Sequence, residues 1–189
     1  MVLMKDGRRR AQTTAKLRAF LAAKDANNLK SLSGDCAQHA FLFEDAALLD
    51  AGLLAYAFAK FLDKPYIVKS KEWREYSRYA LAELEKTQAF FKEGKNEAGA
   101  QTLHALLDEA EALSATLGRF ARSVVEKARV KAATQMYAHG ASLGKAVEIT
   151  QTNKKDVFAY IGGTHLQEQY ATLGVRQRFE NAKKLFEDK

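Results

Sequence analysis

The chain has 189 residues, 47% of them hydrophobic and 28% charged, with one proline, one cysteine and a net charge of +7. This length allows one domain with a sizeable core, and the apolar content excludes a disordered chain. A single cysteine excludes an intrachain disulfide, and no apolar run reaches the roughly 20 residues of a membrane helix. Because proline is scarce while alanine, leucine, lysine and glutamate are frequent, the composition predicts an all-α protein. The single cysteine and the lack of a membrane helix predict a protein of the cytoplasm without a membrane partner.

The net charge is divided unevenly along the sequence. Residues 1–35 contain eight Lys or Arg and three Asp or Glu, which gives +5. Residues 36–118 contain nine Lys or Arg and 13 Asp or Glu, which gives −4. Residues 119–189 contain 13 Lys or Arg and seven Asp or Glu, which gives +6. Basic ends around an acidic middle are typical of a protein whose ends face a polyanion, and also of a solvated lysine-rich surface.

Residues 1–35 are expected to form a basic N-terminal helix followed by a linker. Leu17, Phe20 and Leu21 share one helical face, and residues 27–34 (NNLKSLSG) have the composition of a loop. The three arginines at positions 8–10 are either an arm that contacts phosphates or a solvated terminus.

The most apolar stretch, residues 38–62, is predicted to be the central helix of an antiparallel bundle over residues 36–118. Apolar side chains surround this helix, and Pro65 follows its end. Glu44, Asp45 and Asp50 indicate either metal ligation or charges that complement the helix dipole. Since no Glu-x-x-His pair accompanies them, we expect no metal and no cofactor.

Two further helices, over residues 71–92 and 97–117, are joined by four turn residues and should pack antiparallel. Aromatic residues of the first helix are either core or stacking platforms for a single-stranded nucleic acid. They are Trp73, Tyr76, Tyr79, Phe90 and Phe91.

Residues 119–164 are predicted to contain three consecutive helices. Apolar spacing indicates a helix over residues 124–139, which Gly140 ends, and a short helix over residues 143–149. Ser142 is a suitable N-cap for the second helix, and Asn153 for a third over residues 154–161. Three helices whose last two are joined by a tight turn form a helix-turn-helix module.

This module resembles small prokaryotic helix-turn-helix proteins of the antitoxin or regulator type, and the whole chain is similar to helical proteins of archaea. In the first family, G-x-S-L-G-x-A-A-E-L precedes the turn and S-x-x-E-F opens the recognition helix. The matching residues are Gly140, Ser142, Leu143, Gly144, Ala146, Glu148 and Ile149, with Asn153 and Asp156 in place of Ser and Glu.

The chain departs from this pattern at three positions in and before the turn. Val147 stands where alanine is usual, Gln151 where glycine is usual, and Thr152 where an apolar residue is usual.

The resemblance implies that the protein binds duplex DNA as a transcriptional regulator. Lys154 and Lys155 would face the major groove or its phosphates, and Asn153 would cap their helix at an end that favours phosphate. Ser142 and Lys145 would contact the DNA backbone. Because one short helix rarely makes enough base contacts, we expect a homodimer.

The remaining apolar residues near the C-terminus are assigned to the interior. Val157, Tyr160 and Ile161 are expected in the core of the module, and Phe158 is expected either at an exposed position or packed on the bundle. Residues 165–189 are predicted to contain a closing helix, from about residue 175, that completes the core or pairs with a second copy.

An enzyme is not expected, and no catalytic residue is assigned. The four histidines lack ligand spacing, and no phosphate-binding glycine loop is present. Helical ribonuclease toxins of the HEPN type are bundles of similar length, but the arginine and histidine that they carry on one helix have no counterpart here. Two alternatives to DNA binding remain: a helical adaptor whose acidic bundle binds a protein partner, and an RNA-binding protein without sequence specificity.

Overall fold

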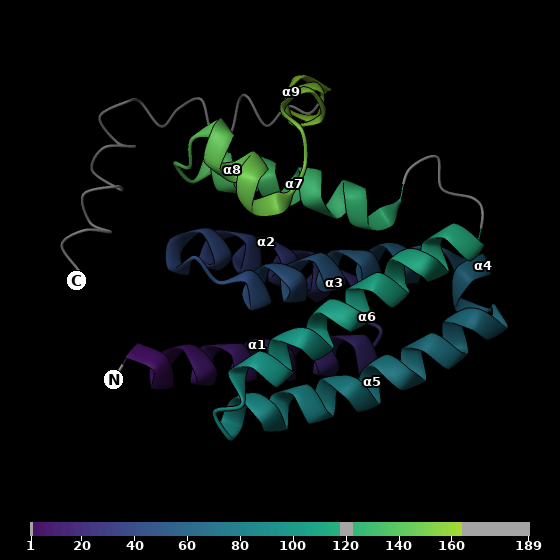
Figure 1. Cartoon of the computed structure of the whole chain (residues 1–189). Coiled ribbons are helices and arrows are strands. Elements are labelled where there is room, and N and C mark those ends of the chain that lie inside the picture. Colours follow the sequence, from purple (N-terminus) through teal and green to yellow (C-terminus); the bar gives the residue numbers. More distant parts are fainter. Residues whose placement is uncertain (1, 118–122, 164–189) are drawn as a thin grey trace.

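The computed structural model describes residues 2–117 and 123–163, and within these ranges the chain forms nine helices and no strand (Figure 1). The prediction of an all-α fold is therefore confirmed. The helices are α1 (Val2–Ala22), α2 (Ala26–Phe43), α3 (Ala46–Leu62), α4 (Pro65–Val68), α5 (Lys71–Lys92), α6 (Asn96–Thr116), α7 (Val124–Ala138), α8 (Leu143–Thr150) and α9 (Lys154–Gly163). In this described part of the chain, no helix combines the length and apolar character that a membrane span requires.

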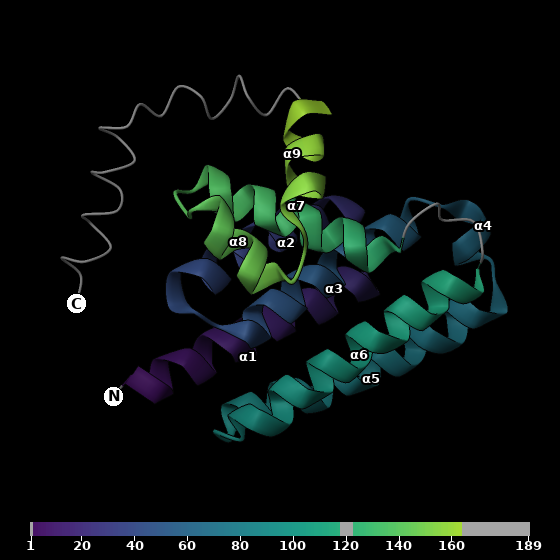
Figure 2. The same ribbon diagram turned by 45° about the horizontal axis from the view of Figure 1, so that its top comes forward.

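Helix α3 is the centre of the fold. Every residue from 51 to 59 is buried, because α1, α2, α6 and α7 all pack against this helix. On one side, α5 and α6 form an antiparallel hairpin, and α1 lies along α5 (Figure 1). On the other side α7 lies across α2 and α3, and α8 and α9 pack on α7. Helix α9 thus lies at the end of the molecule opposite α5 (Figure 2).

Helices α2 and α3 approach each other very closely at Gly52. A Cβ atom at this position would stand 2.7 Å from the Cβ of Cys36 and 3.3 Å from the carbonyl oxygen of Ser33. Cys36 is only 2% exposed, and burial raises the pKa of its thiol to about 12. The glycine therefore permits a contact that leaves the thiol enclosed.

The stretch predicted as one helix over residues 38–62 is in fact two helices. α2 ends at Phe43, and Glu44 adopts a left-handed conformation (φ 49°, ψ 42°) that turns the chain. Asp45 then caps α3, because its carboxylate accepts the backbone N–H groups of Ala47 at 3.0 Å and Leu48 at 3.2 Å. The acidic residues here were expected either to ligate a metal or to complement a helix dipole. Asp45 lies at the N-terminus of α3, which agrees with the second interpretation.

Residues 27–34, predicted as a linker, lie inside α2, so that prediction is wrong. Asp25 caps this helix by accepting the N–H of Asn28 at 3.0 Å. Leu29 and Leu32 are buried, and a Cβ atom on Gly34 would stand 2.9 Å from Oε1 of Gln135 in α7. Tertiary packing therefore outweighs the loop-like composition of this segment.

The arginines at positions 8–10 belong to α1, and two of them contact the junction of α2 and α3. Arg10 Nε donates to Asp45 Oδ2 at 2.8 Å, and the Arg9 guanidinium lies 3.4 Å over the ring of Phe43. The Asp45 side chain is 3% exposed, so the Arg10–Asp45 ion pair is buried on its acidic side. Neither a phosphate-binding arm nor a solvated terminus describes Arg9 and Arg10, whereas Arg8 is exposed.

The predicted hairpin of two antiparallel helices is confirmed, with α5 at the expected residues and α6 one residue earlier at each end. Trp73, Tyr76 and Phe91 are buried, which identifies them as core residues, and Tyr76 Oη donates to the carbonyl oxygen of Leu106 at 2.7 Å. Tyr79 is exposed. The closing helix predicted from residue 175 lies outside the described residues, and the division of the chain into four segments stays a prediction.

Candidate nucleic-acid interface

Helices α7, α8 and α9 lie at the positions predicted from the sequence and form the candidate interface. Ser142 Oγ accepts the N–H of Lys145 at 3.1 Å, and Asn153 Oδ1 accepts the N–H of Asp156 at 2.8 Å. Both predicted N-caps are therefore confirmed. The Asn153 side-chain amide also donates to the Asp156 carboxylate, which ties the first turn of α9 together.

The turn between α8 and α9 accommodates glutamine at the position where glycine is usual in the resembled motif. Gln151 has φ 53° and ψ 39°, in the left-handed region that glycine adopts at little cost. The N–H of Thr152 bonds to the carbonyl oxygen of Val147 at 3.3 Å, which closes the end of α8. Arg129 of α7 supports the turn, because its Nη1 donates to the carbonyl oxygen of Thr150 at 3.2 Å.

The inner side of α9 is fixed by apolar packing. Val157 is fully buried, as predicted, and so is Ala146 of α8. Tyr160 and Ile161 are half-buried, so they belong to the core only in part. Because Val157 can point only inward, the opposite side of α9 must face solvent.

The outer side of α9 carries Lys154, Lys155, Phe158 and Ala159, which are all exposed and recur at helical spacing. Phe158 is 60% exposed. Of its two expected positions, exposed or packed on the bundle, the structure shows the exposed one. This face therefore combines two ammonium groups with one large apolar ring.

The two residues predicted to contact DNA from α8 are more constrained than the lysines of α9. Ser142 is exposed, but its Oγ already accepts the capping hydrogen bond. Lys145 is half-buried, and its Nζ lies 3.6 Å from Glu148 Oε1 and 4.0 Å from Glu44 Oε1. Two carboxylates thus compete with any phosphate for Lys145. The five predicted residues occupy the N-caps and first turns of two successive helices.

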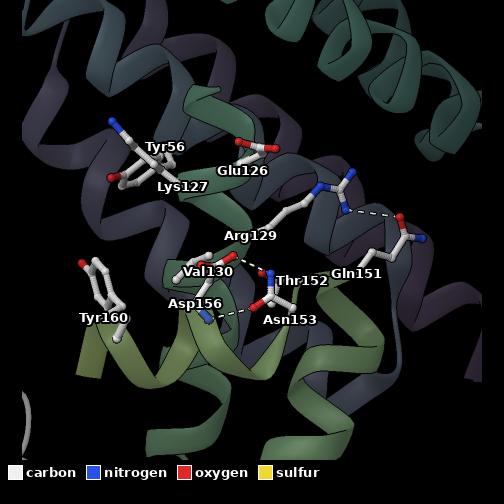
Figure 3. Close-up of a pocket in the computed structure, with 11 residues that line it drawn as sticks. Tyr56, Glu126, Lys127, Arg129, Val130, Gln151, Thr152, Asn153, Asp156 and Tyr160 are labelled. Atoms are coloured by element: carbon white, nitrogen blue, oxygen red, sulfur yellow. Dashed lines mark hydrogen bonds between the residues drawn. The ribbon is translucent and has the colours of Figure 1, made fainter. Parts of the chain in front are cut away.

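A hollow of about 740 Å³ lies beside the turn (Figure 3). Its walls include Tyr56 of α3, Arg129 and Val130 of α7, and Asp156 and Tyr160 of α9. These residues come from three separate helices, of which α3 is far from the other two in the sequence, and no periodic spacing relates them. Sequence reasoning therefore did not find the hollow.

Burial changes the ionisation of two groups beside the hollow. It raises the pKa of the Tyr56 phenol to about 12, and the nearby Tyr160 adds to this effect. Burial also lowers the pKa of Lys131, and the charges of Lys60 and Lys30 lower it further. The ammonium groups of Lys60 and Lys131 lie 5.4 and 5.2 Å from the centre of the Tyr56 ring. A neutral tyrosine is thus flanked by two cations.

The histidines of the described residues have structural contacts. His104 Nδ1 lies 3.1 Å from Asp50 Oδ2, between α6 and α3, and burial raises the pKa of Asp50. His139 Nδ1 lies 2.8 Å from the carbonyl oxygen of Gln135 at the end of α7. Over residues 2–117 and 123–163, no three His, Cys, Asp or Glu side chains gather in a way that could hold a metal ion.

Neither a family model, nor a curated protein, nor a solved structure matches this chain. The molecule is an all-α protein in which a basic helix, α9, is presented at one end.

Proposed function

We propose that the protein binds duplex DNA through α9 and regulates transcription. The observation that carries this proposal is the exposed first turn of α9, which Gln151 and Asn153 position and which carries Lys154 and Lys155. A recognition helix contacts base edges with its N-terminal residues, so an exposed and basic first turn suits the major groove.

The distribution of charge supports the same proposal. Residues 123–163 contain six Lys or Arg and three Asp or Glu, so this segment carries +3. Helix α6 contains four Asp or Glu and no Lys or Arg, and it lies with α5 on the side of the molecule away from α9 (Figure 2). A polyanion is therefore attracted to the α9 segment more than to the surface of α6 itself.

The exposed side chains have different roles in this proposal. Lys154 and Lys155 contact phosphates or base edges, while Ser142 and Lys145 contact the DNA backbone from the start of α8. Phe158 offers an apolar surface that suits the methyl group of thymine. A homodimer would place two copies of α9 in successive turns of the major groove.

The proposal is tested by binding to random-sequence duplex DNA at two salt concentrations. The wild-type protein is expected to bind at low salt and to weaken steeply as salt rises, because each neutralised phosphate contributes about 0.9 to the log–log slope. The double variant with Lys154→Ala and Lys155→Ala should lose about tenfold or more in affinity at low salt, and its slope should decrease by about 2.

A matched double variant, with Lys71→Ala and Lys92→Ala, removes the same two charges from exposed positions on α5. It should bind DNA within about twofold of the wild type, since these lysines lie away from α9. Equal losses in both double variants would mean that net charge alone drives binding. A folded wild-type protein that does not bind duplex DNA at low salt would refute the proposal.

A second candidate function is a helical adaptor for a basic protein partner, and the acidic α6 favours it. Tyr79, 42% exposed on the neighbouring α5, adds an aromatic contact beside this surface. In that case the two double variants would bind their partner equally well. Tighter binding to single-stranded RNA than to duplex DNA, whatever the RNA sequence, would instead indicate RNA binding without sequence specificity.

A further inference from the structure

We propose that the hollow between α3, α7 and α9 binds a small organic anion with a flat ring, and that its occupancy alters how α9 is held. Only the regulatory part of this inference rests on the proposed function, because binding to the hollow requires no DNA. The volume of about 740 Å³ lies within the range of small-molecule sites, roughly 300–1,000 Å³.

Two tyrosines and two aliphatic side chains provide the surface for a ring. Tyr56 and Tyr160 lie on one side of the hollow in Figure 3, and Val130 and Ala159 add apolar surface. Tyr56 is only 7% exposed, and the ammonium groups of Lys60 and Lys131 flank its ring, so the half-buried Tyr160 is the tyrosine that offers a face to a ligand. A flat ring would gain stacking and dispersion contacts from these side chains.

Arg129 provides the group that recognises the anion. Its Nη1 donates to the carbonyl oxygen of Thr150 at 3.2 Å and to Gln151 Oε1 at 3.5 Å, which occupies one of its three nitrogen atoms. Within residues 2–117 and 123–163 this guanidinium forms no ion pair, although its charge acts on the Asp50 carboxylate and opposes the rise that burial causes in the Asp50 pKa. Its remaining donors are able to form the paired hydrogen bonds that a carboxylate or phosphate accepts.

The wall of the hollow contains two basic residues, Lys127 and Arg129, and two acidic ones, Glu126 and Asp156, so any preference for an anion comes from the basic residues behind the wall. Lys127 is part of the wall, and Lys60 and Lys131 lie behind it at the Tyr56 ring. Of the two acidic residues in the wall, Asp156 already accepts a hydrogen bond from the Asn153 amide, and Glu126 lies in the first turn of α7. The N-terminus of α7 stabilises the Glu126 charge.

The same arginine connects the hollow to α9. Arg129 holds the last residue of α8 and the left-handed Gln151, so an anion that engages its guanidinium competes with both hydrogen bonds. The hollow is also lined by Asn153 and Tyr160, which belong to the cap and body of α9. A ligand in the hollow contacts both Arg129, which holds the turn between α8 and α9, and residues of α9 itself. Its binding free energy is therefore coupled to the orientation of α9.

Isothermal titration calorimetry of the full chain with three probes tests the site. Salicylate is a flat aromatic carboxylate, AMP carries a flat ring and a phosphate, and benzamidine is a flat cation. At least one of the two anions should bind about tenfold more tightly than benzamidine. A preference between salicylate and AMP would show whether a carboxylate or a phosphate is the better match to Arg129.

Two variants with one control locate the binding. Arg129→Gln should weaken the anion about tenfold or more, and Tyr160→Ala should weaken it while keeping the guanidinium. Arg74→Gln is the control, because Arg74 on α5 is exposed and its Nε likewise donates to a carbonyl oxygen, that of Ser70 at 3.3 Å. It should leave affinity within about twofold of wild type. Thermal unfolding verifies that each variant is folded. If Arg129→Gln does not fold, anion binding by Tyr160→Ala is the decisive measurement.

Binding of benzamidine as tight as that of both anions, or unchanged anion binding in the decisive variant, would overturn the site. The regulatory part is measured by repeating the DNA titration with the better anion at saturation, where an affinity change of about fivefold or more is expected. An unchanged affinity would overturn that part alone. A protein that binds the anion but no DNA would refute the proposed function and leave the site intact.

Discussion

At the junction of α2 and α3, the carboxylate of Asp45 has three partners. It accepts the backbone N–H groups of Ala47 and Leu48, and Arg10 of α1 donates to it at 2.8 Å. Because the side chain is buried, none of these partners would find water easily if the carboxylate were removed. One residue therefore joins the first three helices of the chain.

We expect Asp45→Ala to reduce the free energy of unfolding by about 3–5 kcal/mol, since it leaves a partly buried guanidinium and two N–H groups without their acceptor. Asp25→Ala is the matched control, because Asp25 caps α2 in the same way at an exposed site. Its loss should be clearly smaller. Denaturant unfolding measures both values, and equal losses would show that the Arg10 contact contributes nothing.

Among the helices, boundaries marked by a cap or a glycine were predictable from the sequence. Ser142 and Asn153 begin α8 and α9 as expected, and Gly140, with φ 105°, follows α7. The boundary at Glu44 and Asp45 was not predictable, because apolar residues continue on both sides at helical spacing. A cap is recognised easily only where the apolar pattern also stops.

The turn at Gln151 gives the clearest prediction for a single element. A left-handed glutamine is strained by about 1 kcal/mol, and glycine is not, so Gln151→Gly should raise the free energy of unfolding by about that amount. Gln101→Gly provides the opposite case, because Gln101 is exposed within α6 and should lose about 1 kcal/mol. Denaturant unfolding of the two variants compares the same substitution in two backbone conformations. A loss in both would contradict the left-handed turn.

For the molecule as a whole, α7 packs on α2, α3 and α6, so the module that carries α9 shares the core of the bundle. We therefore expect one cooperative unfolding transition. Fluorescence of Trp73, buried in α5, and far-UV circular dichroism should give the same midpoint. In Gln151→Gly both midpoints should shift together, although Trp73 lies on another helix. A transition of α7–α9 that precedes the Trp73 transition would contradict this prediction.

Only those residues of the candidate site that lie close together in the sequence were predictable. Lys154 and Lys155 were identified because capping and spacing along one helix place them on an exposed first turn. The hollow was not, because Tyr56, Arg129 and Tyr160 become neighbours only through the packing of α7 and α9 near α3. Contacts between distant segments carry no periodic signal in one sequence.

The close approach of α2 and α3 at Gly52 also determines the chemistry of the one thiol in the chain. Alkylating reagents attack the thiolate, and Cys36 is both enclosed and, with its pKa raised to about 12, protonated at neutral pH. Modification of Cys36 must therefore wait until the two helices separate. Its rate would record how often the folded protein opens at its centre, without any label being engineered into the chain.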